Sequence, residues 1–325
     1  MSFTTSINIE RDFGKTPHYI VTANARQTIG KIINHFASGI HSFCLIGSYG
    51  TGKSSFILAL ENCLCGKTVG KNVLLSQRGQ FNSFEQFSFI NIVGDYTSLA
   101  NLLASHLNAE SKNVISVLDN HYNRLQKTNQ FLVIVIDEFG KVLEHAAKNN
   151  PEKEMYFLQK FCEYVNDTSK NILFLTTLHQ GFGAYAKGLK AEQKQEWTKV
   201  KGRIQDIVFA EPIEQLLNLT ATHISSADKK PTLNTDKIYN LAVASKFAAS
   251  TLDANVARAL YPMDIVSAYV FTQANQRYGQ NERTLFTFLE TRGEGTVNDF
   301  EASINRLYSL ADVHDYIVYN FLLLF

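Results

Sequence analysis

Apolar residues along the chain follow two kinds of pattern. Continuous apolar runs predict strands at 42–46, 87–93, 131–136, 172–176 and 204–209. Between them, apolar residues recur at steps of three and four, which predicts helices such as 97–107, 114–125 and 152–165. Strands that alternate with helices pair in parallel through right-handed crossovers. We therefore expect an α/β fold with a parallel five-stranded sheet flanked by helices, and "FLVIVI" is typical of its central strand.

The pattern changes near residue 212. Segments such as "EPIEQLLNLTATHI" and "MDIVSAYVFTQANQRY" have helical spacing, and no further strand is predicted. The sequence thus predicts an α/β domain over 1–212 and an all-α domain over 213–325. The chain ends in "DYIVYNFLLLF", without a polar tail. Because an exposed apolar end is a liability for a free monomer, we expect a module of a longer protein or an end that a partner buries.

Composition excludes several classes of protein. The 325 residues are 45% apolar, which is enough for a large buried core. Lys and Arg total 31 against 30 for Asp and Glu, so there is no global attraction to nucleic acid or anionic membrane. The start lacks a signal peptide, and the apolar runs are too short to span a bilayer, which predicts a cytoplasmic protein. Four cysteines without a C-x-x-C pair indicate neither a disulfide framework nor a zinc site.

The stretch "CLIGSYGTGKSSFIL" carries the strongest chemical signal. It contains G-x-x-x-x-G-K-[ST] directly after an apolar strand and directly before an amphipathic helix. Glycines let backbone N–H groups turn inward around a phosphate, and the N-terminus of the helix adds partial positive charge. Lys53 is expected to reach the β- and γ-phosphates, and the Ser54 hydroxyl to bind Mg²⁺. The predicted nucleotide-binding residues are Gly47, Ser48, Tyr49, Gly50, Thr51, Gly52, Lys53, Ser54 and Ser55.

A second motif, "FLVIVIDEFG", is acidic and predicts that the bound nucleotide is hydrolysed. Asp137 ends an apolar strand and is expected to hold Mg²⁺, while Glu138 is expected to activate the attacking water. Adjacent Asp and Glu favour an ATPase over most kinases and GTPases. In the sequence, the strand at 87–93 falls between the two motifs. We therefore expect a strand inserted in the sheet between the strand at 42–46, which precedes the phosphate-binding loop, and the strand at 131–136, which precedes Asp137 and Glu138. This order resembles the additional-strand catalytic-glutamate class of P-loop ATPases.

Within that class, two later segments resemble AAA+ ATPases. "NILFLTTLHQ" is similar to the strand that carries sensor 1, which implies that Thr176 or Thr177 bonds the water or the γ-phosphate, with His179 and Gln180 as alternatives. "GRIQDIVFAEPIEQLLNL" is similar to the segment in which an arginine precedes a short strand and the lid. The resemblance places Arg203 as an arginine finger that acts on a neighbouring subunit. The alternative is an arginine in a surface ion pair.

The resemblance also assigns residues outside these strands. The helical remainder looks like the AAA+ lid, and "YGQNERTLFTFLE" is similar to sensor 2, with Arg283 as first choice and Arg277 and Arg258 as competitors. The segment "TPHYIVTANARQTIGKI" corresponds to the region that brackets adenine, which makes Tyr19, Ile20 and Val21 candidates for the base pocket. Asn91, on the second strand, is either a polar partner that restrains Glu138 until a ligand binds or a strand asparagine whose hydrogen bonds are satisfied locally.

The C-terminal run from "YPMDIVSAY" to "RLYSLADVHDYIV" resembles large bacterial ATP-binding proteins of the AAA/STAND type, many associated with defence against phage. The resemblance implies ATP and Mg²⁺ as cofactors and a homo-oligomer with nucleotide at its subunit interfaces. Two functions stay open. Turnover could remodel a partner, in a defence or DNA-associated system, or ATP binding could assemble a switch that hydrolyses slowly. A scaffold without catalysis is disfavoured because Lys53, Asp137 and Glu138 are all present. No DNA-binding motif is evident.

Overall fold

The computed structural model describes residues 7–15, 19, 21–66, 81, 83–225, 235–247, 252–278, 288–289, 295–297, 299–300 and 306–319. The chain divides into two compact units. The larger unit comprises Ile7–Gly47 and Gly52–Ala210, and the smaller is formed chiefly by Glu211–Phe325.

The larger unit is built on a five-stranded sheet in which every pairing is parallel. Its strands are β1 (Ser42–Ile46), β2 (Gln86–Val93), β3 (Gln130–Asp137), β4 (Ile172–Leu178) and β5 (Gln205–Val208). Their order across the sheet is β2-β3-β4-β1-β5. The predicted parallel sheet is confirmed, and the predicted strand ends lie within two residues of those in the structure.

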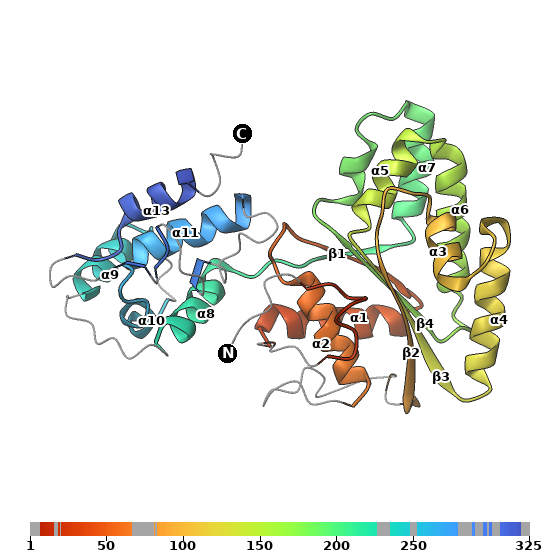
Figure 1. Cartoon of the computed structure of the whole chain (residues 1–325), viewed down its shortest axis with the longest axis horizontal. Coiled ribbons are helices and arrows are strands. Elements are labelled where there is room, and N and C mark those ends of the chain that lie inside the picture. Colours follow the sequence, from red (N-terminus) through yellow and green to blue (C-terminus); the bar gives the residue numbers. More distant parts are fainter. Residues whose placement is uncertain are drawn as a thin grey trace. The chain divides into compact units, whose positions relative to one another are not determined.

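Helices cover both faces of this sheet (Figure 1). One face carries α1 (Ala23–Ala37) and α2 (Lys53–Leu64). The other carries α3 (Leu99–Leu107), α4 (Val114–Gln126), α5 (Gly140–Lys148), α6 (Pro151–Val165) and α7 (Ala191–Lys201), with short 3₁₀ turns η2 (Ser111–Asn113) and η3 (Phe182–Ala186). The smaller unit contains α8 (Ile213–Ser225), α9 (Thr235–Ala244), α10 (Ala254–Ala259), α11 (Ile265–Tyr278) and α13 (Leu310–Ile317).

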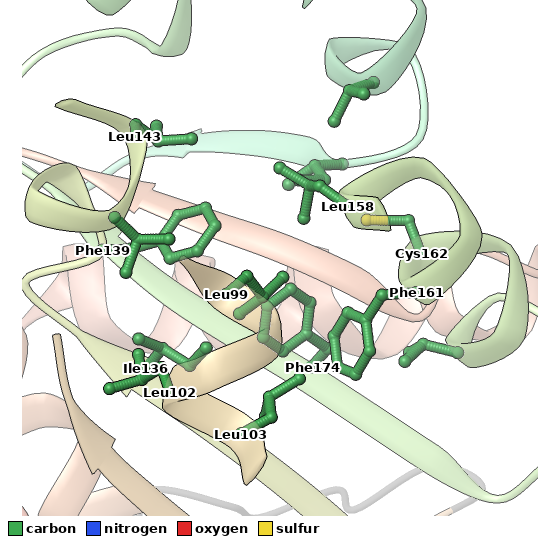
Figure 2. Packing of buried hydrophobic residues seen from close by; sticks show 14 of the residues in the cluster. Leu99, Leu102, Leu103, Ile136, Phe139, Leu143, Leu158, Phe161, Cys162 and Phe174 are labelled. Atoms are coloured by element: carbon green, nitrogen blue, oxygen red, sulfur yellow. The ribbon is translucent and has the colours of Figure 1, made fainter. Parts of the chain in front are cut away.

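Strand β3 explains why the sheet is covered twice. Alternate side chains of a strand point to opposite faces. Leu132 and Ile134 accordingly join the core beneath α3–α7, whereas Val133 and Val135 join the core beneath α1 and α2. Figure 2 shows the first of these cores, where Phe174 of β4 lies beside side chains from α3 and α6. A strand that is apolar on both faces therefore needs a helical layer on each.

The strand inserted between β1 and β3 is β4, whereas β2 lies at the edge of the sheet. The sequence position of β2 between the two motifs pointed to the wrong strand. Burial explains the arrangement, because all seven residues of β4 are buried while most of β2 is only half-buried. A strand without exposed positions is more stable between two neighbours than at an edge.

The smaller unit has an apolar core of its own, which includes Leu217 of α8, Ala257 of α10 and Phe271 of α11. The described part of this unit is helical apart from one isolated bridge between Met263 and Tyr308. Among the described helices, none combines the length and the apolar character needed to cross a membrane.

One buried carboxyl group affects the stability of the larger unit. Glu61 lies on α2 with 3% of its surface exposed. Burial raises the pKa of Glu61 to about 8, and a facing amide, that of Asn91 on β2, offsets only part of this increase. The folded protein therefore keeps Glu61 protonated at neutral pH, whereas the unfolded chain ionises it.

We predict that Glu61→Gln raises the free energy of unfolding at pH 7–8. The folded pKa lies above the unfolded value of 4.5, so the wild-type protein loses stability between pH 4.5 and about 8. The loss is about 1.4 kcal/mol per pH unit, and glutamine removes it while keeping the shape of the side chain. Urea unfolding between pH 5 and 8 measures the difference. The exposed Glu144→Gln should follow the wild type, and parallel curves for Glu61→Gln would contradict the prediction.

Candidate nucleotide-binding site

The loop between β1 and α2 has the shape of a phosphate cradle. Gly50 and Gly52 have φ angles of 74° and 83°, a left-handed conformation that favours glycine. The Thr51 hydroxyl donates a hydrogen bond to the Ser48 carbonyl at 2.9 Å, which ties the loop across its turn. Tyr49, in the same loop, is 39% exposed. The two glycines and the Thr51 bond thus account for the tight turn of this loop.

Lys53 begins α2 and supplies the positive charge of this loop. It is 6% exposed, and its ammonium group donates to the Gly47 carbonyl at 2.5 Å. Burial lowers the pKa of Lys53 to about 8, and the nearby charge of Asp137 opposes this. The first turn of α2 contains no acidic residue, and its cap, Gly52, makes no side-chain hydrogen bond. A desolvated ammonium beside an uncapped helix N-terminus fits a phosphate group. Ser55, in the same turn, is half-buried.

The Asp137 carboxylate lies at the centre of the site. The Ser54 hydroxyl donates to its Oδ2 at 2.7 Å, and the Thr177 hydroxyl donates to its Oδ1 at 2.5 Å. Asp137 is 6% exposed, so these bonds satisfy a carboxylate that is almost removed from water. One hydroxyl and one carboxylate fit Mg²⁺, which prefers oxygen ligands and takes the rest from water and phosphate. In the described ranges, no cluster of three or more His, Cys, Asp or Glu is placed to hold a metal.

Glu138 follows in a strained turn. Its φ is 54°, unusual for a residue with a side chain, and its N–H donates to Asp137 Oδ1 at 3.1 Å and to Thr177 Oγ1 at 2.9 Å. Its carboxylate is 2.6 Å from the Lys141 ammonium, and its side chain is 38% exposed. A half-exposed carboxylate beside the buried Asp137 can contact and deprotonate a bound water.

The two candidate threonines on β4 differ in their contacts. Thr177 bonds Asp137 and the N–H of Glu138, whereas the buried Thr176 donates to the Phe43 carbonyl on β1 at 3.2 Å. Thr177 is therefore the threonine that the structure brings to the acidic pair. His179 follows β4, and burial lowers its pKa to about 4, helped by the charge of Lys53. It is neutral at pH 7, and Gln180 beside it is exposed.

Arg203 lies at the other end of the sheet. It precedes β5, whose first residue pairs with Phe43 near the start of β1. Lys53 and Asp137 follow the carboxyl ends of β1 and β3, so Arg203 does not meet them within this unit. Its guanidinium donates to Glu163 at 2.8 Å and to the Lys199 carbonyl at 2.8 Å. Arg203 thus forms a surface ion pair, and a role in a neighbouring subunit stays a prediction.

The suggestion that Asn91 restrains Glu138 is wrong for this structure. Asn91 pairs in register with Val135 and so points to the α1–α2 face of the sheet, where its amide donates to the Ile9 carbonyl at 3.4 Å. Glu138 lies beyond the end of β3 and is paired with Lys141 instead. The motif spacing could not reveal the face on which Asn91 lies.

The candidates for sensor 2 and for the base pocket are described only in part by the structure. Arg258 forms an ion pair with Asp236 on α9 at 2.8 Å, inside the smaller unit. Arg283 and Ile20 lie outside the described residues, as does the side chain of Arg277. In the N-terminal segment, Val21 is buried in the core beneath α1 and α2, and Tyr19 packs against that core.

Two residues near Glu138 were missed from the sequence. Lys141 lies in the first turn of α5, and its ammonium pairs with the Glu138 carboxylate of the preceding turn. Gly94 directly follows β2, and its N–H donates to the Asp137 carbonyl at 2.7 Å. For Gly94 the sequence offered one signal, a glycine at a strand end. The pairing of Lys141 depends on the turn at Glu138, which is not helical, so residue spacing alone could not reveal it.

No protein-family model and no curated protein matches the chain. Among solved structures, it is similar to C. elegans PCH-2, with a TM-score of 0.45 and 10% identity over 93% of this chain and 69% of that one. It is also similar to the Aeropyrum pernix ORC2 protein. The ADPNP–ADP complexes give a TM-score of 0.41 and 14% identity over 64% of this chain, and the ADP form gives 0.43 and 14% over 80%. The chain spans 53% and 64% of those two ORC2 chains.

We predict that Thr177→Val costs more stability than Thr176→Val. The first change removes a hydrogen bond to a buried carboxylate, worth about 1.5–3 kcal/mol, and the second removes a neutral bond worth about 0.5–1.5 kcal/mol. The two residues are adjacent and both wholly buried, so each variant controls for the packing change in the other. Urea unfolding measures both, and equal losses would count against the special position of Thr177.

Proposed function

We propose that the chain is a Mg²⁺-dependent ATPase of the AAA+/STAND type. The observation that carries this proposal is the Asp137 carboxylate, which accepts hydrogen bonds from Ser54 at the start of α2 and from Thr177 on β4. It joins the phosphate cradle to the strand that bears Glu138. The inserted β4 supports the same assignment, because the resemblance in sequence implies a strand at that place.

The residues divide the work between binding and chemistry. The backbone of Gly47–Lys53 and the Lys53 ammonium bind the phosphates, and Ser54 and Asp137 hold Mg²⁺. The metal, when bound, neutralises charge on the phosphate oxygens. Glu138 orients a water and accepts its proton, and Thr177 fixes the direction of the Asp137–Glu138 turn through two hydrogen bonds.

We expect Glu138→Gln to retain ATP while hydrolysis falls by about 10² or more, because glutamine cannot accept the proton. Steady-state phosphate release and equilibrium binding of ATP, measured on the same preparation, separate the two effects. Glu144→Gln, an exposed glutamate on α5, is the matched control and should behave as the wild type. Unchanged turnover in Glu138→Gln would remove Glu138 from the mechanism.

The oligomer is the second part of the proposal. Arg203 lies on the surface and away from its own cradle, so a neighbouring subunit is the place where it could meet a γ-phosphate. Such an arginine is worth about 10³-fold or more in turnover. Its ion pair with Glu163 is partly exposed, so exchanging that partner for a phosphate costs little.

Mixing inactive subunits tests this arrangement. Arg203→Ala supplies an intact cradle and Lys53→Ala supplies an intact arginine, so a mixture of the two should regain part of the ATPase activity. Glu163→Gln removes the ion pair but keeps the arginine, and we expect it to retain turnover. A flat mixing curve, or equal losses in Arg203→Ala and Glu163→Gln, would indicate that Arg203 only forms the ion pair.

We infer that turnover serves a partner, in a bacterial defence or DNA-associated system. The only support for such a partner and system is the resemblance of the C-terminal run, from "YPMDIVSAY" to "RLYSLADVHDYIV", to the bacterial ATP-binding proteins. The alternative is a switch that assembles on ATP binding and hydrolyses slowly. One observation favours it: Glu138 and Arg203 are both engaged in half-exposed ion pairs, with Lys141 and Glu163, and the low cost of exchanging these partners allows ATP binding or assembly to redirect both side chains.

Measuring ATPase rate and particle size together, with and without nucleic acid, separates these functions. Remodelling predicts steady hydrolysis that rises with the partner or with nucleic acid. A switch predicts ATP-dependent growth in particle size with slow turnover throughout. Absence of both hydrolysis and assembly would reject the proposal.

A further inference from the structure

Gly94 makes an unusually close approach to the Asp137–Glu138 turn. Its N–H donates to the Asp137 carbonyl at 2.7 Å. A Cβ added at Gly94 would lie 2.5 Å from the Glu138 carbonyl oxygen, 2.9 Å from the Glu138 carbonyl carbon and 3.0 Å from the Asp137 oxygen. All three atoms belong to the backbone, so no side chain can swing aside to make room. The φ of Gly94 is not left-handed, and glycine is therefore required here for space rather than for conformation.

The turn on the other side of this contact is strained. A residue with a side chain at φ 54° costs on the order of 1–3 kcal/mol and persists only where the surroundings hold it. Here the Glu138 N–H donates to Thr177 Oγ1 at 2.9 Å, and the Phe139 N–H donates to the Thr177 carbonyl at 3.0 Å. Phe139 is also wholly buried in the core shown in Figure 2. Thr177 and Phe139 thus hold the turn from the β4 side, and the backbone of Gly94 contacts it from the β2 side.

The segment after Gly94 is braced along α5, the helix that follows the turn. The Tyr96 ring lies 5.3 Å from the His145 ring, and the Lys148 ammonium lies 5.8 Å from the Tyr96 centroid. The Asn149 amide also donates to the Tyr96 hydroxyl at 3.4 Å. The segment therefore contacts both ends of α5: Gly94 meets the turn before its first residue, and Tyr96 meets its last turn. A force that moves this segment would reach Glu138 through backbone contact.

We propose that Gly94 is a positioning residue for Glu138: the absence of a side chain lets the end of β2 abut the Glu138 carbonyl, and this contact sets the direction of the Glu138 carboxylate. The proposal rests on the proposed ATPase function. It assigns no role to Gly94 in binding, because the phosphate cradle follows β1, which β3 and β4 separate from β2 in the sheet.

Gly94→Ala tests this. The turn must shift, and a misplacement of about 1 Å can cost about 10²-fold, so we expect kcat to fall by about 10- to 100-fold with KM for ATP nearly unchanged. Gly30→Ala, where an added Cβ has no heavy atom within 4 Å, is the matched control and should match the wild type. In a Glu138→Gln background, Gly94→Ala should cost no further turnover, since both changes act through one group. An unchanged kcat, a rise in KM alone, or additive losses would overturn the proposal.

A second readout does not depend on hydrolysis. The amides of Glu138 and Phe139, which Thr177 holds, should exchange hydrogen faster in Gly94→Ala than in Gly30→Ala. If the wild type shows no ATPase activity that depends on Glu138, the proposed function fails, and amide exchange alone decides whether Gly94 holds the turn. If Gly94→Ala does not fold, Tyr96→Ala is used instead. Tyr96 is 47% exposed, so removing its side chain should leave the protein folded while weakening the contact of this segment with α5. A fall in kcat of about threefold that vanishes in the Glu138→Gln background supports the proposal, and unchanged kcat overturns it.

Discussion

The Asp137 carboxylate and its two hydroxyl donors are the constraint on which the site depends. Ser54 belongs to the helix after β1, Asp137 ends β3, and Thr177 belongs to β4 between them. The three side chains can meet only because parallel strands end at one edge of the sheet and because β4 separates the other two strands. The sheet order thus determines the chemistry: with β2 in that place, the position of Thr177 would be taken by another residue.

Burial makes this arrangement costly to disturb. Lys53 and Asp137 are each 6% exposed, and a buried charge is tolerated only with partners. The Lys53 ammonium has the Gly47 carbonyl, and the carboxylate has its hydroxyl donors and the Glu138 N–H. The desolvation that lowers the pKa of Lys53 to about 8 also strengthens any interaction with phosphate, because the surrounding dielectric is low. The strained φ of Glu138 also depends on its surroundings, because hydrogen bonds from its N–H to Thr177 and Asp137 hold the turn.

Features of the fold that leave a local pattern could be predicted from the sequence. The predictions that failed concern contacts between segments that are distant in the chain. Continuous apolar runs located the strands, because strand burial leaves a local pattern. The two motifs pointed to Lys53, Ser54, Asp137 and Glu138, and the structure joins the two motifs through the bond from Ser54 to Asp137. The sheet order was not local: β2 precedes β3 in the chain yet lies at the edge. The face of Asn91 depended on register, and the choice between Thr176 and Thr177 depended on which residue reached Asp137. The close approach of Gly94 to Glu138 arises between two strand ends and has no signature beyond the glycine.

The site therefore has a fixed part and an adjustable part. The hydroxyl bonds of Asp137 are buried, and breaking one would remove a hydrogen bond to a charged group, at a cost of about 1.5–3 kcal/mol. The ion pairs of Glu138 with Lys141 and of Arg203 with Glu163 are half-exposed, and such pairs contribute only about 0–1 kcal/mol. Exchange of partners at Glu138, and at Arg203 on the far end of the sheet, is thus a low-cost change. These two side chains can therefore be redirected without disturbing the hydrogen bonds of the buried Asp137.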